Sequence, residues 1–161
     1  MKKMVLVVAG LMCLSVSAKN LESRFGFGVA TSDFDNLGMI SLKYFFDHFL
    51  STAVQVGFNT DTKVNATRIG AKLYRSVSME ENISFFLGAG LFVVADQNDT
   101  APKVLSSGFE LDGLIGMEFF FSGLPNLGIA VETGLALRSV RAVTFTSLGT
   151  PFGGAGLHYY F

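Results

Sequence analysis

The chain contains no tryptophan, one cysteine, three prolines and two histidines among its 161 residues. The cysteine, Cys13, lies in the N-terminal apolar segment, so the rest of the chain can form neither a disulfide nor a cysteine-ligated metal site. It follows Met12 and not the small residue that precedes a lipidated cysteine. Two histidines form no histidine-rich metal centre, and we expect no cofactor. Lysine and arginine number 12 against 13 acids, which gives no basic surface for nucleic acid.

The sequence also lacks an apolar run long enough to cross a membrane as a helix, which takes about 20 residues. Its one long apolar run, Met4 to Val16, is interrupted by Gly10. Two lysines precede this run, and Val16-Ser17-Ala18 supplies the small residues of a cleavage site. We therefore predict an export signal peptide over residues 1–18 and a mature domain over residues 19–161.

The mature chain does have alternating apolar and polar residues, in eight segments separated by short polar clusters. No helical periodicity is long enough to compete. An even number of such segments is typical of closed bacterial membrane barrels. We predict an all-β fold, an eight-stranded antiparallel up-and-down transmembrane β-barrel. The predicted strands are residues 23–30, 37–46, 49–58, 64–75, 83–94, 104–121, 127–138 and 147–161.

The connections between these strands alternate in character. With the N-terminus in the periplasm, the periplasmic turns are short and centre on residues 47–48, 78–82 and 122–126. The outer connections centre on residues 32–36, 59–62, 95–103 and 139–146. The last two are longer, as expected for the outer loops of a membrane barrel. A surface ligand, if there is one, is predicted to bind loops 95–103 and 139–146.

Alternation alone does not distinguish a membrane barrel from a soluble β-sandwich, because the strands of a sandwich alternate as well. The positions of the charged residues make the distinction. In the segment 104–121, one face carries large apolar side chains and the other carries small and charged ones. A charge facing lipid near mid-bilayer costs roughly 2 to 4 kcal/mol, so a membrane barrel must turn these groups inward and pair them. The predicted lumen charge network is Lys43, Arg68, Lys72, Glu110, Asp112, Glu118, Glu132 and Arg138.

Glycines also gather on the predicted lumen face, at Gly26, Gly28, Gly88 and Gly90 among others. Small residues there make room for long charged side chains, since eight strands enclose little volume. The alternative is that they open a cavity, which would make the protein a small-solute pore or a hydrophobic-ligand carrier.

Catalysis finds little support in the sequence. His48 and His158 both fall near the predicted periplasmic end, where a polar residue at the membrane interface is the simplest interpretation. No nucleophile–base pair is apparent beside them. The carboxylates have lysines and arginines to pair with, so we predict no catalytic residue and no enzyme.

Aromatic residues accumulate near the predicted periplasmic interface and are interpreted as half of an aromatic girdle. These are Tyr44, Phe45, Phe46, Tyr74, Phe85, Phe86, Phe119, Phe120, Phe121, Tyr159, Tyr160 and Phe161. The terminal alternating segment with Tyr159 and Phe161 resembles the closing strand of bacterial outer-membrane barrels. The barrel-assembly machinery recognises that strand. We therefore interpret Tyr159 and Phe161 as the assembly signal.

The sequence resembles the small outer-membrane barrel family typified by OmpA-type and OmpX-type domains. The resemblance lies in the predicted signal peptide, the eight alternating strands and the terminal segment with Tyr159 and Phe161. The resemblance covers residues 19–161. It implies a monomer in the outer membrane of a Gram-negative bacterium, in contact with outer-membrane lipid and the barrel-assembly machinery. The role it implies is structural or surface-interacting, with the lumen plugged by polar and paired charged side chains. A secreted soluble lipid-binding barrel is a further alternative, but its apolar face would point inward.

Overall fold

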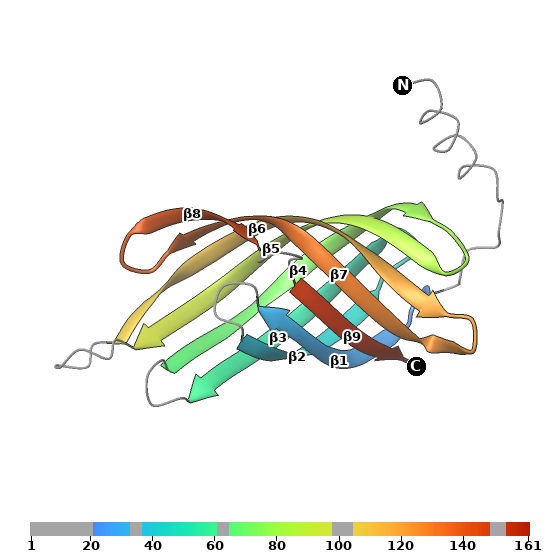
Figure 1. Cartoon of the computed structure of the whole chain (residues 1–161), viewed down its shortest axis with the longest axis horizontal. Helices are drawn as coiled ribbons and strands as arrows, with labels where there is room; N and C mark the ends of the chain where they lie inside the picture. Colours follow the sequence, from blue (N-terminus) through green and yellow to red (C-terminus); the bar gives the residue numbers. More distant parts are fainter. Residues whose placement is uncertain (1–20, 33–36, 61–64, 98–104, 149–153) are drawn as a thin grey trace, which may run out of the picture.

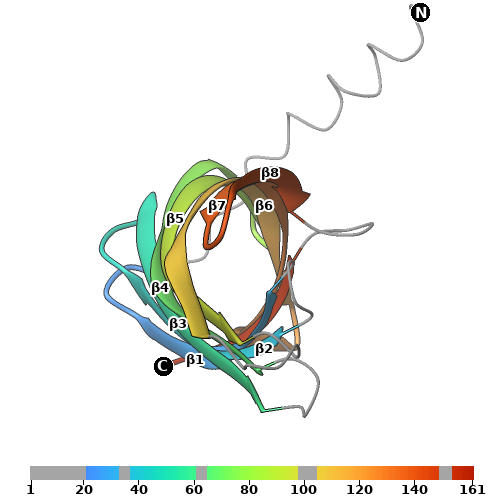
Figure 2. The same ribbon diagram turned by 90° about the vertical axis from the view of Figure 1, so that its left-hand side faces the viewer.

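The computed structural model describes residues 21–32, 37–60, 65–97, 105–148 and 154–161, where all regular structure is β-strand. Neighbouring strands pair antiparallel from β1 to β7, and β7 pairs also with β8 and β9. β9 pairs back with β1 and closes the barrel seen in Figure 2. The predicted all-β, eight-stranded antiparallel barrel is confirmed, with β8 and β9 sharing the eighth position. The strands in Figure 1 are β1 (Phe25–Ser32), β2 (Leu37–Phe45), β3 (Leu50–Thr60), β4 (Asn65–Met79), β5 (Ile83–Gln97), β6 (Leu105–Phe121), β7 (Leu124–Ser139), β8 (Val143–Leu148) and β9 (Gly154–Tyr160).

No helix among the described residues is long and apolar enough to cross a membrane.

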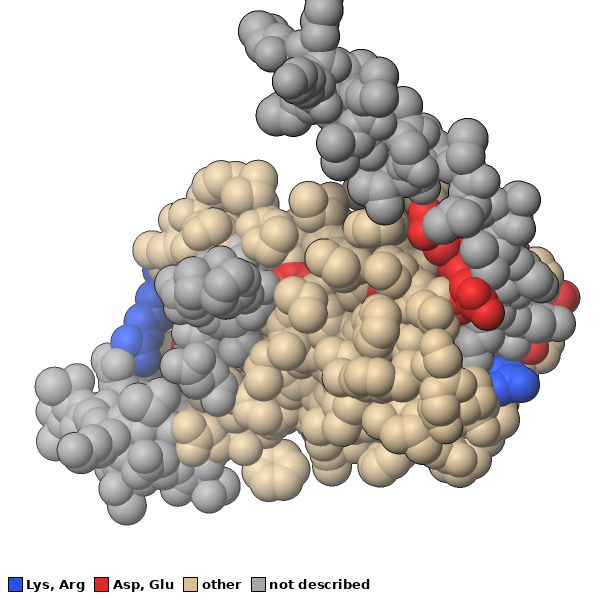
Figure 3. All heavy atoms as spheres, turned by 45° about the vertical axis from the view of Figure 1, so that its right-hand side comes forward, with Lys and Arg blue, Asp and Glu red and all other residues tan. Residues whose placement is uncertain are grey.

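The two faces of the wall follow from the period of a strand, whose successive side chains point to opposite sides. In β2, Met39, Ser41 and Lys43 are buried inside, whereas Ile40 and Leu42 are about half exposed outside. The other strands repeat this pattern. The outward side chains are mostly large and apolar. On the face shown in Figure 3, the middle of the surface is largely uncharged, and most acidic and basic side chains lie near the two ends.

The barrel closes between the first and last strands. Gly26 to Ala30 of β1 pair with Tyr160 to Gly156 of β9. The Thr31 hydroxyl accepts a hydrogen bond from the Ala155 amide at 2.9 Å, which extends the seam by one step. Within the described part of the chain, the remaining edge of β8 has no strand partner.

The last strand is where the prediction from sequence is wrong. The segment 147–161 is not one strand, and residues 139–146 are not a loop. β8 forms a hairpin with β7 through the turn 140–142 and pairs with Gly134–Ser139, whereas β9 pairs with Leu127–Glu132. Only Thr133 separates the two sets of partners on β7, although five residues join β8 to β9. This connection contains Pro151, which has no N–H to donate to a strand ladder.

The short connections lie together at one end of the barrel, which we call the turn end. Figure 1 shows the β4–β5 and β6–β7 hairpins and the C-terminus at this end, with the β7–β8 hairpin at the opposite, loop end. In the β2–β3 turn, the Asp47 carboxylate accepts hydrogen bonds from the amides of Phe49 at 2.6 Å and Leu50 at 2.7 Å. Such bonds are the reason that aspartate favours tight turns.

Several strands are longer toward the loop end than predicted. β5 continues to Gln97, so residues 95–97 of the predicted loop 95–103 are strand. The remainder of that loop lies outside the described residues, as do residues 33–36 and 61–62 of the other predicted outer connections and the predicted signal peptide. At the turn end, β4 continues to Met79 through a β-bulge between Ser76 and Ser78.

The aromatic girdle is smaller than predicted, because nearly half of its members point inward. Tyr44, Phe46, Phe85, Phe119, Phe121, Tyr159 and Phe161 lie on the outer wall. Phe45, Tyr74, Phe86, Phe120 and Tyr160 are buried inside. Consecutive aromatics on a strand necessarily alternate between the two faces, so a run such as Phe119-Phe120-Phe121 cannot belong entirely to an outer girdle.

Candidate functional site

The barrel interior holds the candidate functional site, because every residue of the predicted lumen charge network is buried there. These residues come from β2, β4, β6 and β7. Small residues sit beside them in the register: Lys72 lies between Ala53 and Gly90, and Glu132 lies between Gly116 and Gly154. A Cβ at Gly90 would come within 3.2 Å of Asp112 Oδ2. The small residues therefore provide the room that the long charged side chains occupy.

One group of charges, the loop-end cluster, comprises Arg68, Asp96, Glu110, Asp112 and Arg138. Arg68 Nη2 forms ion pairs with Glu110 Oε1 and, at 2.9 Å, with Asp112 Oδ2. Arg138 Nη2 lies 2.6 Å from Asp96 Oδ2, and Arg138 Nε lies 4.0 Å from Glu110 Oε2. Glu110 thus stands between two arginines, which joins the five side chains into one network.

Arg68 is held by packing as well as by charge. Its guanidinium carbon lies 3.7 Å from the centre of the Phe92 ring, within the range of a cation–π interaction. Both Arg68 and Phe92 are almost completely buried. An arginine in this position offers its planar donors to two carboxylates while its face covers an aromatic ring.

A second group, the turn-end cluster, comprises Lys43, Tyr160, Glu118, Lys72, Glu132 and Tyr74. Lys43 Nζ lies 2.7 Å from Glu118 Oε2, and the Tyr160 hydroxyl donates a hydrogen bond to the other oxygen of that carboxylate. Lys72 forms an ion pair with Glu132, and the Tyr74 hydroxyl donates to Glu132 Oε2 at 3.3 Å. Each buried carboxylate in this cluster thus contacts a lysine and a tyrosine.

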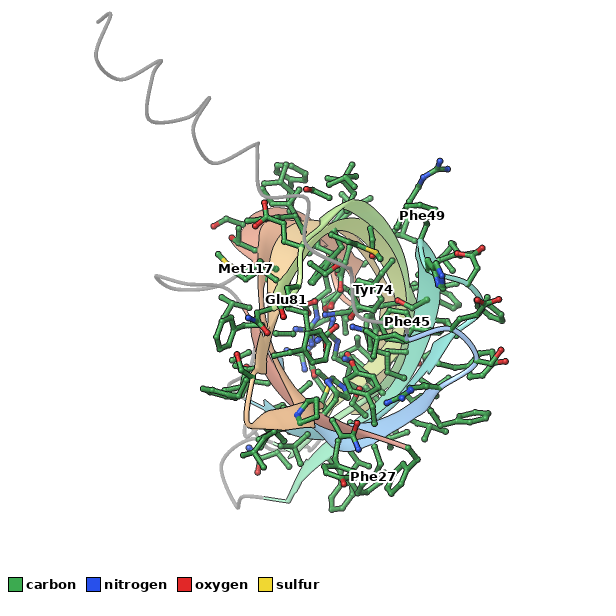
Figure 4. All side chains as sticks on the ribbon, turned by 90° about the vertical axis from the view of Figure 1, so that its right-hand side faces the viewer. Phe27, Phe45, Phe49, Tyr74, Glu81 and Met117 are labelled. Carbon is green, nitrogen blue, oxygen red and sulfur yellow. The ribbon has the colours of Figure 1, made fainter. Side chains whose placement is uncertain are left out.

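Aromatic side chains fill the interior of the barrel between this cluster and the turn end. Tyr160, with none of its surface exposed, packs against Phe45 and Phe120 with ring centres 5.7 and 5.8 Å away. Leu21, from the segment that precedes β1, completes the same apolar group. Figure 4, viewed from the turn end, shows Phe45 and Tyr74 inside the barrel and Phe27, Phe49 and Met117 outside it.

The structure also brings together a serine and a histidine that the sequence analysis did not connect. His158 Nε2 lies 2.8 Å from Ser41 Oγ, and both side chains are buried. His158 is therefore an interior residue, and its interpretation as an interface residue is wrong. Among the residues that the structure describes, its Nδ1 has no hydrogen-bond partner, so none of their carboxylates orients the ring as in a catalytic triad. The adjoining cavity, of about 10 Å³, is large enough for about one water molecule.

Other members of the site were also missed from sequence. Asp96 falls in the predicted loop 95–103, although it continues the inward series of Phe92 and Val94 on β5. Tyr74 and Tyr160 were assigned to the girdle, although their positions share the inward face. Strict alternation along each strand would have identified all three. The pairing of Ser41 with His158 had no signal in the sequence, since 117 positions separate them.

The two residues of the predicted assembly signal lie on the outer wall at the turn end. Tyr159 and Phe161 are exposed, and their rings meet edge to face with centres 5.2 Å apart. Among the described residues, no group of three or more histidine, aspartate or glutamate side chains is placed to hold a metal ion.

The solved structures that resemble this chain include two small barrels. The N-terminal β-barrel domain of Pseudomonas aeruginosa OprF matches with a TM-score of 0.68 and 12% sequence identity, over 87% of this chain and 98% of that domain. Neisserial surface protein A (NspA) matches with a TM-score of 0.55 and 18% identity, over 86% of this chain and 94% of that protein. No model of a protein family matches the sequence. No curated protein matches it either. The chain therefore has the fold of small outer-membrane barrels, established from structure alone.

Proposed function

We propose that this protein is an integral outer-membrane β-barrel with a structural or surface-interaction role and a lumen plugged by its own side chains. The observation that carries the proposal is the combination of an apolar outer wall with buried, paired charges inside. In water, such a protein would expose its apolar residues and bury its charges, which reverses the usual arrangement. In a bilayer the same arrangement is favourable, because the lipid solvates the wall and the ion pairs satisfy one another.

The location in the outer membrane has three supports. The first is the fold shared with the OprF barrel domain and NspA. The second is the predicted export signal over residues 1–18. The third is the pair Tyr159 and Phe161, which we propose as the contact with the barrel-assembly machinery. In this orientation the turn end faces the periplasm and the loop end faces outward. We expect a monomer.

The plugged lumen is proposed because the charged groups of both clusters occupy the interior and leave little room. The cavity beside His158 measures about 10 Å³. An eight-stranded barrel generally encloses only enough space to be filled by side chains. A small-solute pore and a carrier of hydrophobic ligands would each need a wider passage or chamber. The soluble lipid-binding barrel is disfavoured because its apolar face would have to point inward.

We propose no catalytic role, although Ser41 and His158 are hydrogen-bonded. None of the Ser41 surface is exposed, so no substrate carbonyl can reach its hydroxyl. The neighbouring Lys43 forms an ion pair with Glu118, and His158 Nδ1 has no orienting partner within the described part of the chain. The pair is better explained as part of the polar filling of the barrel.

The surface-interaction part of the proposal concerns the loop end. The β7–β8 hairpin lies at this end (Figure 1) and exposes Val143 and Phe145 at its tip and side. This hairpin replaces the predicted loop 139–146 as a candidate contact for a surface ligand. The part of loop 95–103 beyond Gln97 lies outside the described residues and is retained as the other candidate.

The experiment that tests the proposal is planar-bilayer recording on the purified protein, combined with gel electrophoresis before and after heating. We expect the unheated protein to migrate differently from the heated one, as a folded membrane barrel does, and to give no discrete conductance steps. Reproducible openings would favour the pore. A protein that stays in solution without detergent and does not enter lipid would favour the soluble barrel.

A further inference from the structure

The outer wall carries an apolar groove of about 560 Å³ across β4, β5, β6 and β7. The groove lies on the side that faces lipid in the proposed function, and Met117, which lines it, is seen on the outer wall in Figure 4. The side chains that form its walls are Val77, Phe85, Leu87, Ile115, Met117 and Val131. Each is between about one third and three fifths exposed, so no other part of the described chain covers them.

The groove has a direction relative to the turn end. A single row of paired residues crosses this part of the wall, from Leu50 through Arg75, Leu87 and Ile115 to Thr133. Along this row the distance from the turn end increases. Leu50 is the first residue of β3, Arg75 is four residues from the end of β4, and Thr133 is nine residues into β7. The groove therefore rises obliquely from near the turn end toward the middle of the wall.

Arg75 stands at the lower end of this groove. Its side chain is exposed on the outer wall, beside Leu87 in the register and two positions from Val77, both of which line the groove. No hydrogen bond or ion pair to its guanidinium is present in the described part of the chain. The strands that the structure describes carry no acidic side chain on their outer face that could pair with it. Near the membrane interface such an arginine costs only about 0 to 1 kcal/mol, because its long side chain can reach the headgroups.

We propose that this groove binds one anionic phospholipid of the periplasmic leaflet, with its phosphate on the Arg75 guanidinium and an acyl chain along the groove. Arginine recognises phosphate through two parallel hydrogen bonds. The oblique rise of the groove matches the path of an acyl chain from the headgroup level into the hydrocarbon. A second copy packed through the same strands would instead bury Arg75 against an outer face whose described strands carry no acidic side chain. The inference rests on the proposed function, since it requires that the wall face lipid.

The absence of tryptophan makes a direct test possible, because one introduced tryptophan is then the sole indole reporter. Phe85→Trp places it in the groove, and Phe27→Trp places it on β1, on another part of the outer wall seen in Figure 4. The full chain would be purified from the membranes of an expressing host and reconstituted into phosphatidylcholine vesicles. Quenching would be measured as brominated phosphatidylglycerol or brominated phosphatidylcholine replaces part of the lipid.

We expect the indole of the Phe85→Trp protein to favour phosphatidylglycerol over phosphatidylcholine by about fivefold in relative binding constant, the effect of one basic group. Arg75→Gln should abolish this preference and Arg75→Lys should retain most of it. The Phe27→Trp protein should show no preference. Equal quenching by both lipids at position 85, or a preference unchanged by Arg75→Gln, would overturn the proposal.

Two further outcomes are distinguishable. If the Phe27→Trp reporter is quenched but the Phe85→Trp reporter is shielded from both brominated lipids, a second copy covers the groove, which overturns the lipid site and leaves the membrane barrel intact. If neither reporter is quenched, the wall does not face lipid. That result would overturn the proposed function together with the lipid site.

Discussion

Lys43 and Glu118 form an ion pair 2.7 Å long across the barrel, between strands β2 and β6, which are not neighbours in the sheet. Both side chains are almost fully buried, and the rings of Phe45 and Tyr74 lie about 5 Å from Lys43 Nζ. This pair crosses the lumen and ties opposite parts of the wall together. A buried pair of this kind also makes the cost of losing one partner much larger than the cost of losing both.

Replacement of Glu118 by leucine should therefore destabilise the barrel by about 3 to 5 kcal/mol, because Lys43 is left as an uncompensated buried charge. The double variant Lys43→Met/Glu118→Leu should recover most of that loss. The free energy of unfolding would be measured by urea titration in lipid vesicles, with heat-dependent gel mobility as the readout. Equal destabilisation in the single and double variants would show that the charge pairing is not what holds these strands.

The loop-end cluster allows a comparison between deep and shallow charges. Glu110 has no exposed side-chain surface and contacts two arginines, whereas the Asp96 side chain is 29% exposed and, among the described residues, forms an ion pair with Arg138. Glu110→Gln should cost several kcal/mol, since it weakens a fully buried network, and Asp96→Asn should cost about 1 kcal/mol or less. The same urea titration would compare the two. Similar losses would contradict the ranking by burial.

Much of this architecture could be predicted from the sequence, because alternation along a strand fixes which side chains share a face. This alternation predicts an interior position for Lys43, Arg68 and Glu132. The sequence could not supply the pairing between them. Lys43 and Glu118 are 75 positions apart, and their contact depends on how the whole wall curves.

The errors have physical causes of their own. The predicted girdle includes whole aromatic runs, although neighbours such as Tyr159 and Tyr160 point to opposite faces. The final strand was extended through Pro151, which a strand ladder does not accommodate in its interior. The groove beside Arg75 had no sequence signal, because it depends on the relative offsets of four strands.

The outer wall should tolerate a charge near its rim but not near its middle. Leu135 is the twelfth of the sixteen residues of β7, away from both ends of the strand, and is half exposed, whereas Leu124 is the first residue of the same strand. Leu135→Lys should reduce insertion into vesicles and destabilise the inserted barrel by about 2 to 4 kcal/mol, while Leu124→Lys should cost about 0 to 1 kcal/mol. Folding yield in vesicles and the urea midpoint would measure both effects. Comparable behaviour of the two variants would contradict the assignment of this face to lipid.

Gly28 allows the backbones of β1 and β9 to approach closely, and closure of the barrel requires this approach. It pairs with His158 across the β1–β9 seam, and a Cβ at this position would overlap the carbonyl oxygen of Leu157 and come within 2.8 Å of His158 Cα. Gly38 on β2 is the matched control, since a Cβ there meets nothing within 4 Å. Alanine normally stabilises a strand by about 0.5 to 1 kcal/mol relative to glycine. Gly38→Ala should therefore raise the urea midpoint slightly, whereas Gly28→Ala should lower it and reduce the fraction of protein with folded gel mobility, because β1 and β9 must separate to admit the methyl group. If Gly28→Ala folds as well as Gly38→Ala, the seam is not closed at the spacing seen here.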